Sequence, residues 1–115
     1  MAKQISPTEA TKLCDNYDAK YNDLSRVIGK EDNRSCSLSL EELKNYIDYL
    51  EKSKNNIDGI CIYFGSYSNN EGPMKTASNN LTTVFLAPTS NGLDNKSLNV
   101  LNALGSGRPP RKKYS

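Results

Sequence analysis

The chain has 115 residues, 36% of them hydrophobic, and its 15 basic and 13 acidic side chains give a net charge of +2. This length fits one domain, since domains commonly run to about 100–150 residues. No apolar run approaches the ~18 residues of a membrane span, and residues 1–6 lack the apolar stretch of a secretory signal, so we expect a cytoplasmic protein without membrane contact.

Composition also argues against a metal or cofactor. The sequence contains no histidine, and its three cysteines, Cys14, Cys36 and Cys61, are widely spaced. Zinc sites usually combine closely spaced cysteines with further ligands, and disulfide frameworks belong to secreted proteins. We therefore expect three free thiols, no metal and no cofactor.

The first predicted element is a helix that begins after Ser6. Ser6 and Glu9 have the spacing of a capping box, and Pro7 suits the first helical position. Apolar residues then recur every three or four positions, which predicts about four turns with one face in the core. That face comprises Ala10, Leu13, Cys14, Tyr17, Tyr21 and Leu24.

The next stretch is ambiguous, and a well-defined second helix follows it. Residues 27–29 fit either a short strand or a helix end, and residues 35–38 alternate like a short edge strand. Ser39 and Glu42 then form a second capping-box pattern, flanked by Leu38 and Leu43 at the spacing of a hydrophobic staple. We predict a helix over residues 40–53.

Two β-rich runs predict the sheet. Residues 59–67 and 81–88 are apolar on both faces, and we expect them to pair as a central antiparallel hairpin, with the second run ending at Pro88. Residues 68–80 make an unusually long hairpin loop, and such loops are either functional or disordered. Asn91 and Gly92 indicate a turn, and a weak apolar pattern favours a short helix over residues 95–103.

Together these elements predict an α+β fold, with two main helices packed on a small antiparallel sheet, possible additional short strands and a short C-terminal helix. Residues 1–107 would form the single domain. Residues 108–115 read as a basic flexible tail, because they carry four cations and two prolines and have little that could join a core. Without this tail, the chain has 11 basic and 13 acidic side chains.

The segments SLEELKNYIDYL, DGICIYFGSY and TTVFLAPT, followed by Gly105, Gly107 and the Pro109-Pro110 pair, resemble a set of short uncharacterised bacterial proteins of Bacteroidota type. The resemblance covers roughly residues 38–114. It implies a bacterial cytosolic protein with a helix followed by two strands. It brings no activity, cofactor or catalytic residue with it.

No catalytic motif stands out. General acid–base catalysis needs carboxylates held in a cleft, whereas the acidic pair at residues 31–32 falls in a polar loop and the pair at residues 41–42 at a helix start. Cys61 has no histidine to activate it as a nucleophile, and no phosphate-binding glycine motif is present. We therefore expect no enzymatic activity.

The remaining signals favour binding. Tyrosines beside a long loop are typical interface anchors, and clustered cations steer encounters with acidic or phosphorylated partners. We predict a non-enzymatic protein-binding module of inhibitor, immunity-type or accessory kind, acting through residues 66–80, the sheet edge and the basic tail. The alternatives are nucleic-acid binding through the tail and a small enzyme or ligand-binding protein, and both a monomer and a homodimer stay open. The candidate interaction residues are Tyr67, Tyr63, Met74, Lys75, Arg108, Arg111, Lys112 and Lys113.

Overall fold

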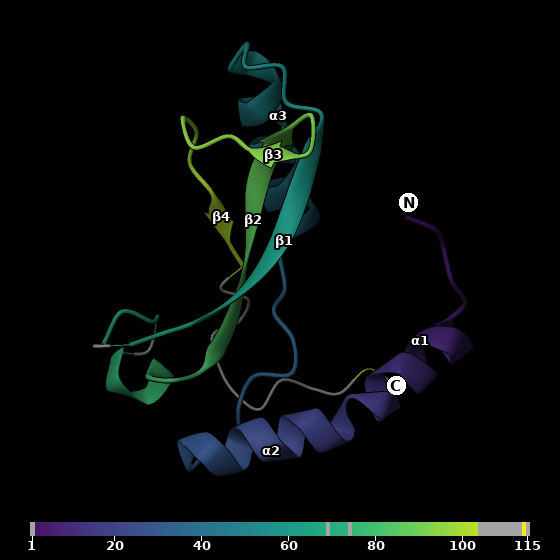
Figure 1. The fold of residues 1–115 in the computed structure, drawn as a ribbon, viewed down its shortest axis with the longest axis vertical. Helices are drawn as coiled ribbons and strands as arrows, with labels where there is room; N and C mark the ends of the chain where they lie inside the picture. Colours follow the sequence, from purple (N-terminus) through teal and green to yellow (C-terminus); the bar gives the residue numbers. More distant parts are fainter. Residues whose placement is uncertain (1, 69, 74, 104–113, 115) are drawn as a thin grey trace.

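A computed structural model describes residues 2–68, 70–73, 75–103 and 114. In this part of the chain, three α-helices and a four-stranded antiparallel sheet confirm the predicted α+β class (Figure 1). The helices are α1 (Pro7–Asn16), α2 (Asp18–Ile28) and α3 (Leu40–Lys52). The strands are β1 (Gly59–Ser66), β2 (Thr82–Ser90), β3 (Leu93–Asp94) and β4 (Leu101–Asn102), and a 3-10 turn spans Lys75–Ser78.

The first predicted helix is divided into two. The Ser6 hydroxyl accepts a hydrogen bond from the Glu9 N–H, so the predicted capping box starts α1. At Tyr17 the regular ladder is interrupted, because the Tyr17 N–H donates to the Cys14 carbonyl at 3.1 Å and α2 begins anew. Gly29, at φ +76°, caps α2 in the left-handed conformation that glycine adopts without strain. Residues 27–29 are therefore a helix end.

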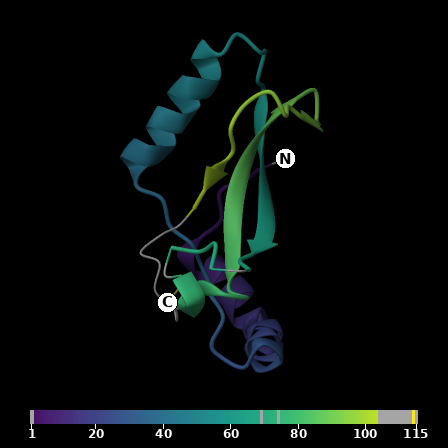
Figure 2. The same ribbon diagram turned by 90° about the vertical axis from the view of Figure 1, so that its left-hand side faces the viewer.

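The expectation that this helical face is core was wrong. α1 buries none of its residues, and Tyr21 is the buried residue of α2. Leu13 remains 61% exposed. The reason is that the two helices project from one end of the sheet and do not lie flat on it (Figure 2). We call residues 7–28 the α1–α2 arm.

α3 supplies the main helical layer, as predicted. The Ser39 hydroxyl accepts from the Glu42 N–H at 3.0 Å, while the Ser39 N–H donates to the Glu42 carboxylate at 2.9 Å. The buried side chains of Tyr46 and Leu50 then pack against Leu86 of β2 to form the core. Tyr46 is also anchored, since its hydroxyl donates to the Asn99 carbonyl at 2.7 Å.

The predicted antiparallel hairpin is confirmed, but its position in the sheet is not. β1 pairs with β2 in a continuous register from Gly59–Thr89 to Ser66–Thr82. β2 is the inner strand, since β3 and β4 pair with its other side, and β1 lies at the edge of the described sheet. β1 was expected to be central, so that expectation was wrong.

Three further details differ from prediction. β2 continues through Pro88 to Ser90, because the Pro88 backbone faces away from β1, where its carbonyl accepts from the Asn95 N–H. The short helix over residues 95–103 does not form. The turn predicted at Asn91 and Gly92 is confirmed: with φ of 52° and 79°, they make a two-residue hairpin turn into β3. Residues 35–38 likewise form no strand.

The long loop between β1 and β2 has a structure of its own. The Tyr67 N–H donates to the Leu81 carbonyl at 3.1 Å, and the Asn80 N–H donates back to the Tyr67 carbonyl at 2.8 Å, so the base of the loop is closed. Within it, the Asn70 side chain accepts from the Thr76 hydroxyl at 2.9 Å. The described part of this loop is therefore held by hydrogen bonds of its own.

Candidate functional site

The outer edge of β1, opposite to its pairing with β2, is the first notable feature. The carbonyls of Val84 and Pro88 accept hydrogen bonds from Ala103 and Asn95, on the side of β2 away from β1. Backbone groups alternate in direction along an antiparallel strand. The odd-numbered residues of β1 therefore bond to β2, and the even-numbered residues direct their N–H and carbonyl groups outward. Among the described residues, no strand pairs with this edge.

The side chains of the same even-numbered residues lie on the face of the sheet that α3 covers in part. Ile60 packs under α3 against the core cluster. Beyond the reach of α3, Ile62 is 62% exposed and Phe64 is 79% exposed. Single exposed apolar side chains are common, but these two are neighbours on one face of β1, and contiguous exposed apolar side chains mark interaction sites.

Two hollows connect Phe64 to the α1–α2 arm. The first, of about 320 Å³, has Leu13, Arg34 and Val84 in its wall, and the second, of about 470 Å³, has Leu24 and Thr82. Phe64 and Tyr17 line both. Leu13 and Leu24 of the arm therefore share these hollows with Phe64 of β1. We call these three residues, together with Ile62, which lies two residues from Phe64 on the same face of β1, the apolar surface.

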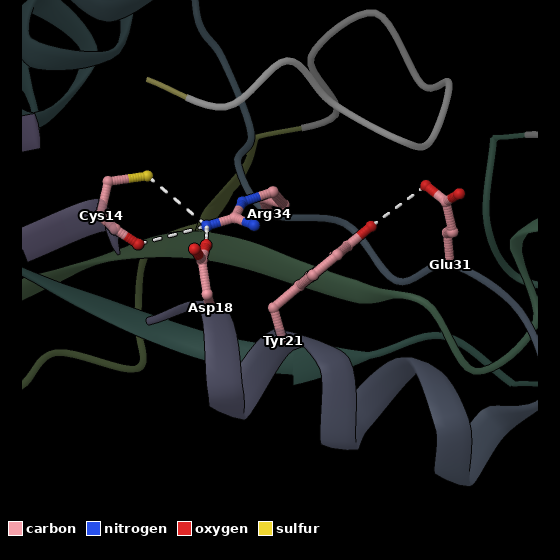
Figure 3. A network of polar contacts seen from close by, with 5 residues as sticks. All are labelled: Cys14, Asp18, Tyr21, Glu31 and Arg34. Atoms are coloured by element: carbon pink, nitrogen blue, oxygen red, sulfur yellow. Dashed lines mark hydrogen bonds and ion pairs between the residues drawn. The ribbon is translucent and has the colours of Figure 1, made fainter. Parts of the chain in front are cut away.

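A network around Arg34 holds the arm in place beside this surface (Figure 3). The Arg34 guanidinium donates through Nη2 to Asp18 Oδ1 at 2.7 Å, to the Cys14 carbonyl at 3.2 Å and to Cys14 Sγ at 3.6 Å. It also lies over the Tyr21 ring, 4.6 Å from its centroid. One arginine from the α2–α3 linker thereby ties α1 to α2.

Electrostatics in this network fit a positioning role. The hydrogen bond to Asp18 raises the pKa of Arg34 and keeps it charged. Burial, together with the nearby Glu31 carboxylate that accepts from the phenol, raises the pKa of Tyr21 and keeps it neutral. Arg34 Nε is buried with no hydrogen-bond partner in the described structure. Neither side chain is poised to exchange a proton near neutral pH.

Asp32 is the most deeply buried carboxylate, with 2% of its surface exposed. Oδ1 accepts from the Thr82 N–H at 2.6 Å and the Asn33 N–H at 2.8 Å, and Oδ2 accepts from the Thr82 hydroxyl at 2.6 Å. Three donors satisfy this carboxylate, and none of them is a cation. Asp32 therefore fastens the α2–α3 linker to the start of β2.

The structure describes three of the predicted interaction residues, and each of them contacts or lies on a different part of the fold. Tyr63 stacks on Phe85 with centroids 5.3 Å apart, and its hydroxyl donates to the Asp94 carboxylate at 2.5 Å. The Tyr67 hydroxyl lies 3.0 Å from that of Thr83. Lys75 is exposed at the start of the 3-10 turn. Met74, Arg108, Arg111, Lys112 and Lys113 lie outside the described residues.

The hydroxyl groups of both tyrosines thus form contacts within the fold. The exposed aromatic residue of β1 is Phe64. Sequence reasoning missed Ile62 and Phe64, because it assigned the whole strand to the core. A strand that is apolar on both faces, in a chain with few helices to cover it, was the available signal.

Among the residues that the structure describes, no cluster of three potential ligands could hold a metal ion, and no helix has both the length and the hydrophobicity to cross a membrane. Comparisons with protein-family models, with curated proteins and with solved structures found no match. The class of this protein is therefore defined by its fold and site: it is a small α+β protein in which the described part of the sheet has an unpaired strand edge beside an apolar surface.

Proposed function

We propose that this chain is a non-enzymatic, cytoplasmic protein-binding module of inhibitor, immunity-type or accessory kind, whose contact site is the outer edge of β1. The observation that carries the proposal is the coincidence of outward-facing backbone groups with the exposed side chains of Ile62 and Phe64. An added strand obtains affinity from main-chain hydrogen bonds and specificity from alternate side chains.

The sequence of β1 supports a binding edge, since it lacks the features that protect edges from pairing. Proteins usually protect an edge strand with a lysine, a proline or a bulge. Between Gly59 and Ser66 there is no charged residue and no proline, and the register with β2 runs without a bulge. Such an edge, left uncovered in a cell, would invite indiscriminate association.

The arm contributes side-chain contacts to the same site. A strand added beside β1 places every second side chain next to Ile62 and Phe64, and Leu13 and Leu24 face Phe64 across the two hollows. An extended segment with apolar residues at alternate positions would meet this surface. The β1–β2 loop and the basic tail remain additional predicted contacts.

The test compares proteins captured from cell lysate by the native chain, by Phe64→Lys and by Val27→Lys. Val27 is the matched control, because it is 80% exposed on α2 and lines neither hollow. We expect the native chain and Val27→Lys to capture the same stoichiometric partner, and Phe64→Lys to lose it. Equal capture by all three proteins would show that the β1 edge is not the contact site.

A further inference from the structure

The geometry points to a second copy of this chain as the occupant of the β1 edge, paired antiparallel about a two-fold axis at Tyr63. This inference rests on the proposed function, because it names the partner of the same site. The two sheets would join through their β1 strands into one continuous sheet with both α3 helices on one face.

The first argument is hydrogen-bond parity. In an antiparallel pair, residues whose backbone groups face each other exchange two hydrogen bonds. A two-fold axis at Tyr63 sets Ile62 of one copy opposite Phe64 of the other, and Ile60 opposite Ser66. All of these are even-numbered residues, whose N–H and carbonyl groups point outward. The edge can therefore pair with itself without a shift in register or an unmatched backbone group.

The second argument is the match of the side chains. This register places each exposed Ile62 against an exposed Phe64 on the same face, twice over. An axis at Ile62 would instead set Phe64 against Ile60, which α3 already covers. Pairs of aromatic and β-branched residues are among the favourable cross-strand pairs. Because β1 carries no charge, no like charges meet when it pairs with its own copy.

The area that this contact would bury is that of a weak association. Eight residues of strand extend about 26 Å. With Ile62, Phe64 and the neighbouring Leu13 from each copy, the interface is nearer to the weak class, below about 1,200 Å² in total, than to an obligate dimer. We therefore expect a dissociation constant on the order of 1–100 μM.

The experiment is sedimentation equilibrium of the full chain from about 1 to about 500 μM, which brackets the expected constant. The native chain and Val27→Lys should pass from monomer to dimer over this range, and Phe64→Lys should dimerise at least tenfold more weakly. Circular dichroism confirms that both variants are folded, which we expect because both side chains are mostly exposed. Ile62→Lys provides an independent second variant.

Amide hydrogen exchange distinguishes strand pairing from non-specific hydrophobic association. At concentrations above the dissociation constant, the amides of Ile62 and Phe64 should become protected, because they acquire partners only in the dimer. The amides of Cys61 and Tyr63, which face β2, should change little. Protection that alternates along β1 would identify strand pairing about the edge.

Two results would overturn the inference. A chain that stays monomeric at every concentration excludes the second copy, and if Phe64→Lys still loses a captured partner, the proposed function stands with a different protein on the edge. A dimer that persists in Phe64→Lys without protection at Ile62 and Phe64 shows that the copies meet elsewhere. Equal lysate capture by all variants, together with a chain that stays monomeric, would instead remove the proposed function itself.

Discussion

Asp32 offers the sharpest test of how the linker is attached to the sheet. Its carboxylate accepts three hydrogen bonds from Thr82 and Asn33 and has almost no contact with water. Asp32→Ala removes both acceptor oxygens and all three hydrogen bonds at once, and leaves the two N–H groups and one hydroxyl without partners. A buried donor that loses its partner costs about 1–3 kcal/mol, and the penalties partly overlap when water enters the space.

We therefore expect Asp32→Ala to lower the free energy of unfolding by about 3–5 kcal/mol, the lower part of the sum of three such overlapping penalties. Asp32→Asn should cost much less, about 1 kcal/mol, since only the charge assistance is lost. Its amide oxygen can still accept from both N–H groups, and its NH₂ can donate to the Thr82 hydroxyl, which is able to act as acceptor.

Urea denaturation followed by far-UV circular dichroism measures both values, because the chain has no tryptophan for fluorescence. Asp23→Ala is the control, since among the described residues this carboxylate pairs with Arg26 in an exposed ion pair, and its loss should cost less than about 0.5 kcal/mol. If Asp32→Ala and Asp32→Asn are equally stable, or if Asp32→Ala behaves like the control, the carboxylate does not fasten the linker.

Three further predictions follow from the contacts of other side chains. Arg34→Ala should lower the free energy of unfolding by about 1–2 kcal/mol, and limited proteolysis should then cut the α1–α2 arm faster. Ser39→Ala removes the N-cap of α3 and should cost about 1 kcal/mol in urea denaturation. Burial raises the pKa of Tyr21 and Tyr46, and the hydrogen bond to Asp94 raises the pKa of Tyr63. The unfolded chain then releases these protons first, so the melting temperature should hold below about pH 10 and fall as the pH rises further.

Helix starts were the most predictable part of this fold, because their signals are local. The pairs Ser6–Glu9 and Ser39–Glu42 form capping boxes wherever the chain around them is helical, whatever the rest of the protein does. The hairpin of β1 and β2 was also predicted, because both runs are apolar and strands that follow one another along the chain usually pair. Side chains that interact only within a few residues can be placed from the sequence.

The errors arose where a contact over long distance decides the structure. The apolar residues from 93 to 104 fit a helix by their spacing, but pairing with β2 after the Asn91–Gly92 turn holds parts of this segment as strands. The apolar face of the first helical segment was placed in the core by the same local reasoning. Nothing within residues 7–24 indicates that the break at Tyr17 and the Arg34 network would hold these helices away from the sheet.

The exposed side chains of Ile62 and Phe64 were missed because the sequence of a strand does not show which chain covers it. A strand that is apolar on both faces has the same sequence whether its own chain or another chain covers it. In this fold, α3 covers Ile60 but not Ile62 or Phe64, and the helices that could have covered them form the α1–α2 arm.

The stability of the arm connects these observations. A helix as short as α1 is marginal in water, and most helical stability in proteins comes from packing. α1 has no buried residue, so its capping box and the bond from Arg34 to the Cys14 carbonyl must supply much of what holds it. A partner strand beside β1 would lie next to Leu13 and add the missing packing. Because anything that binds only the folded state stabilises it by mass action, order in the arm and occupation of the β1 edge should increase together.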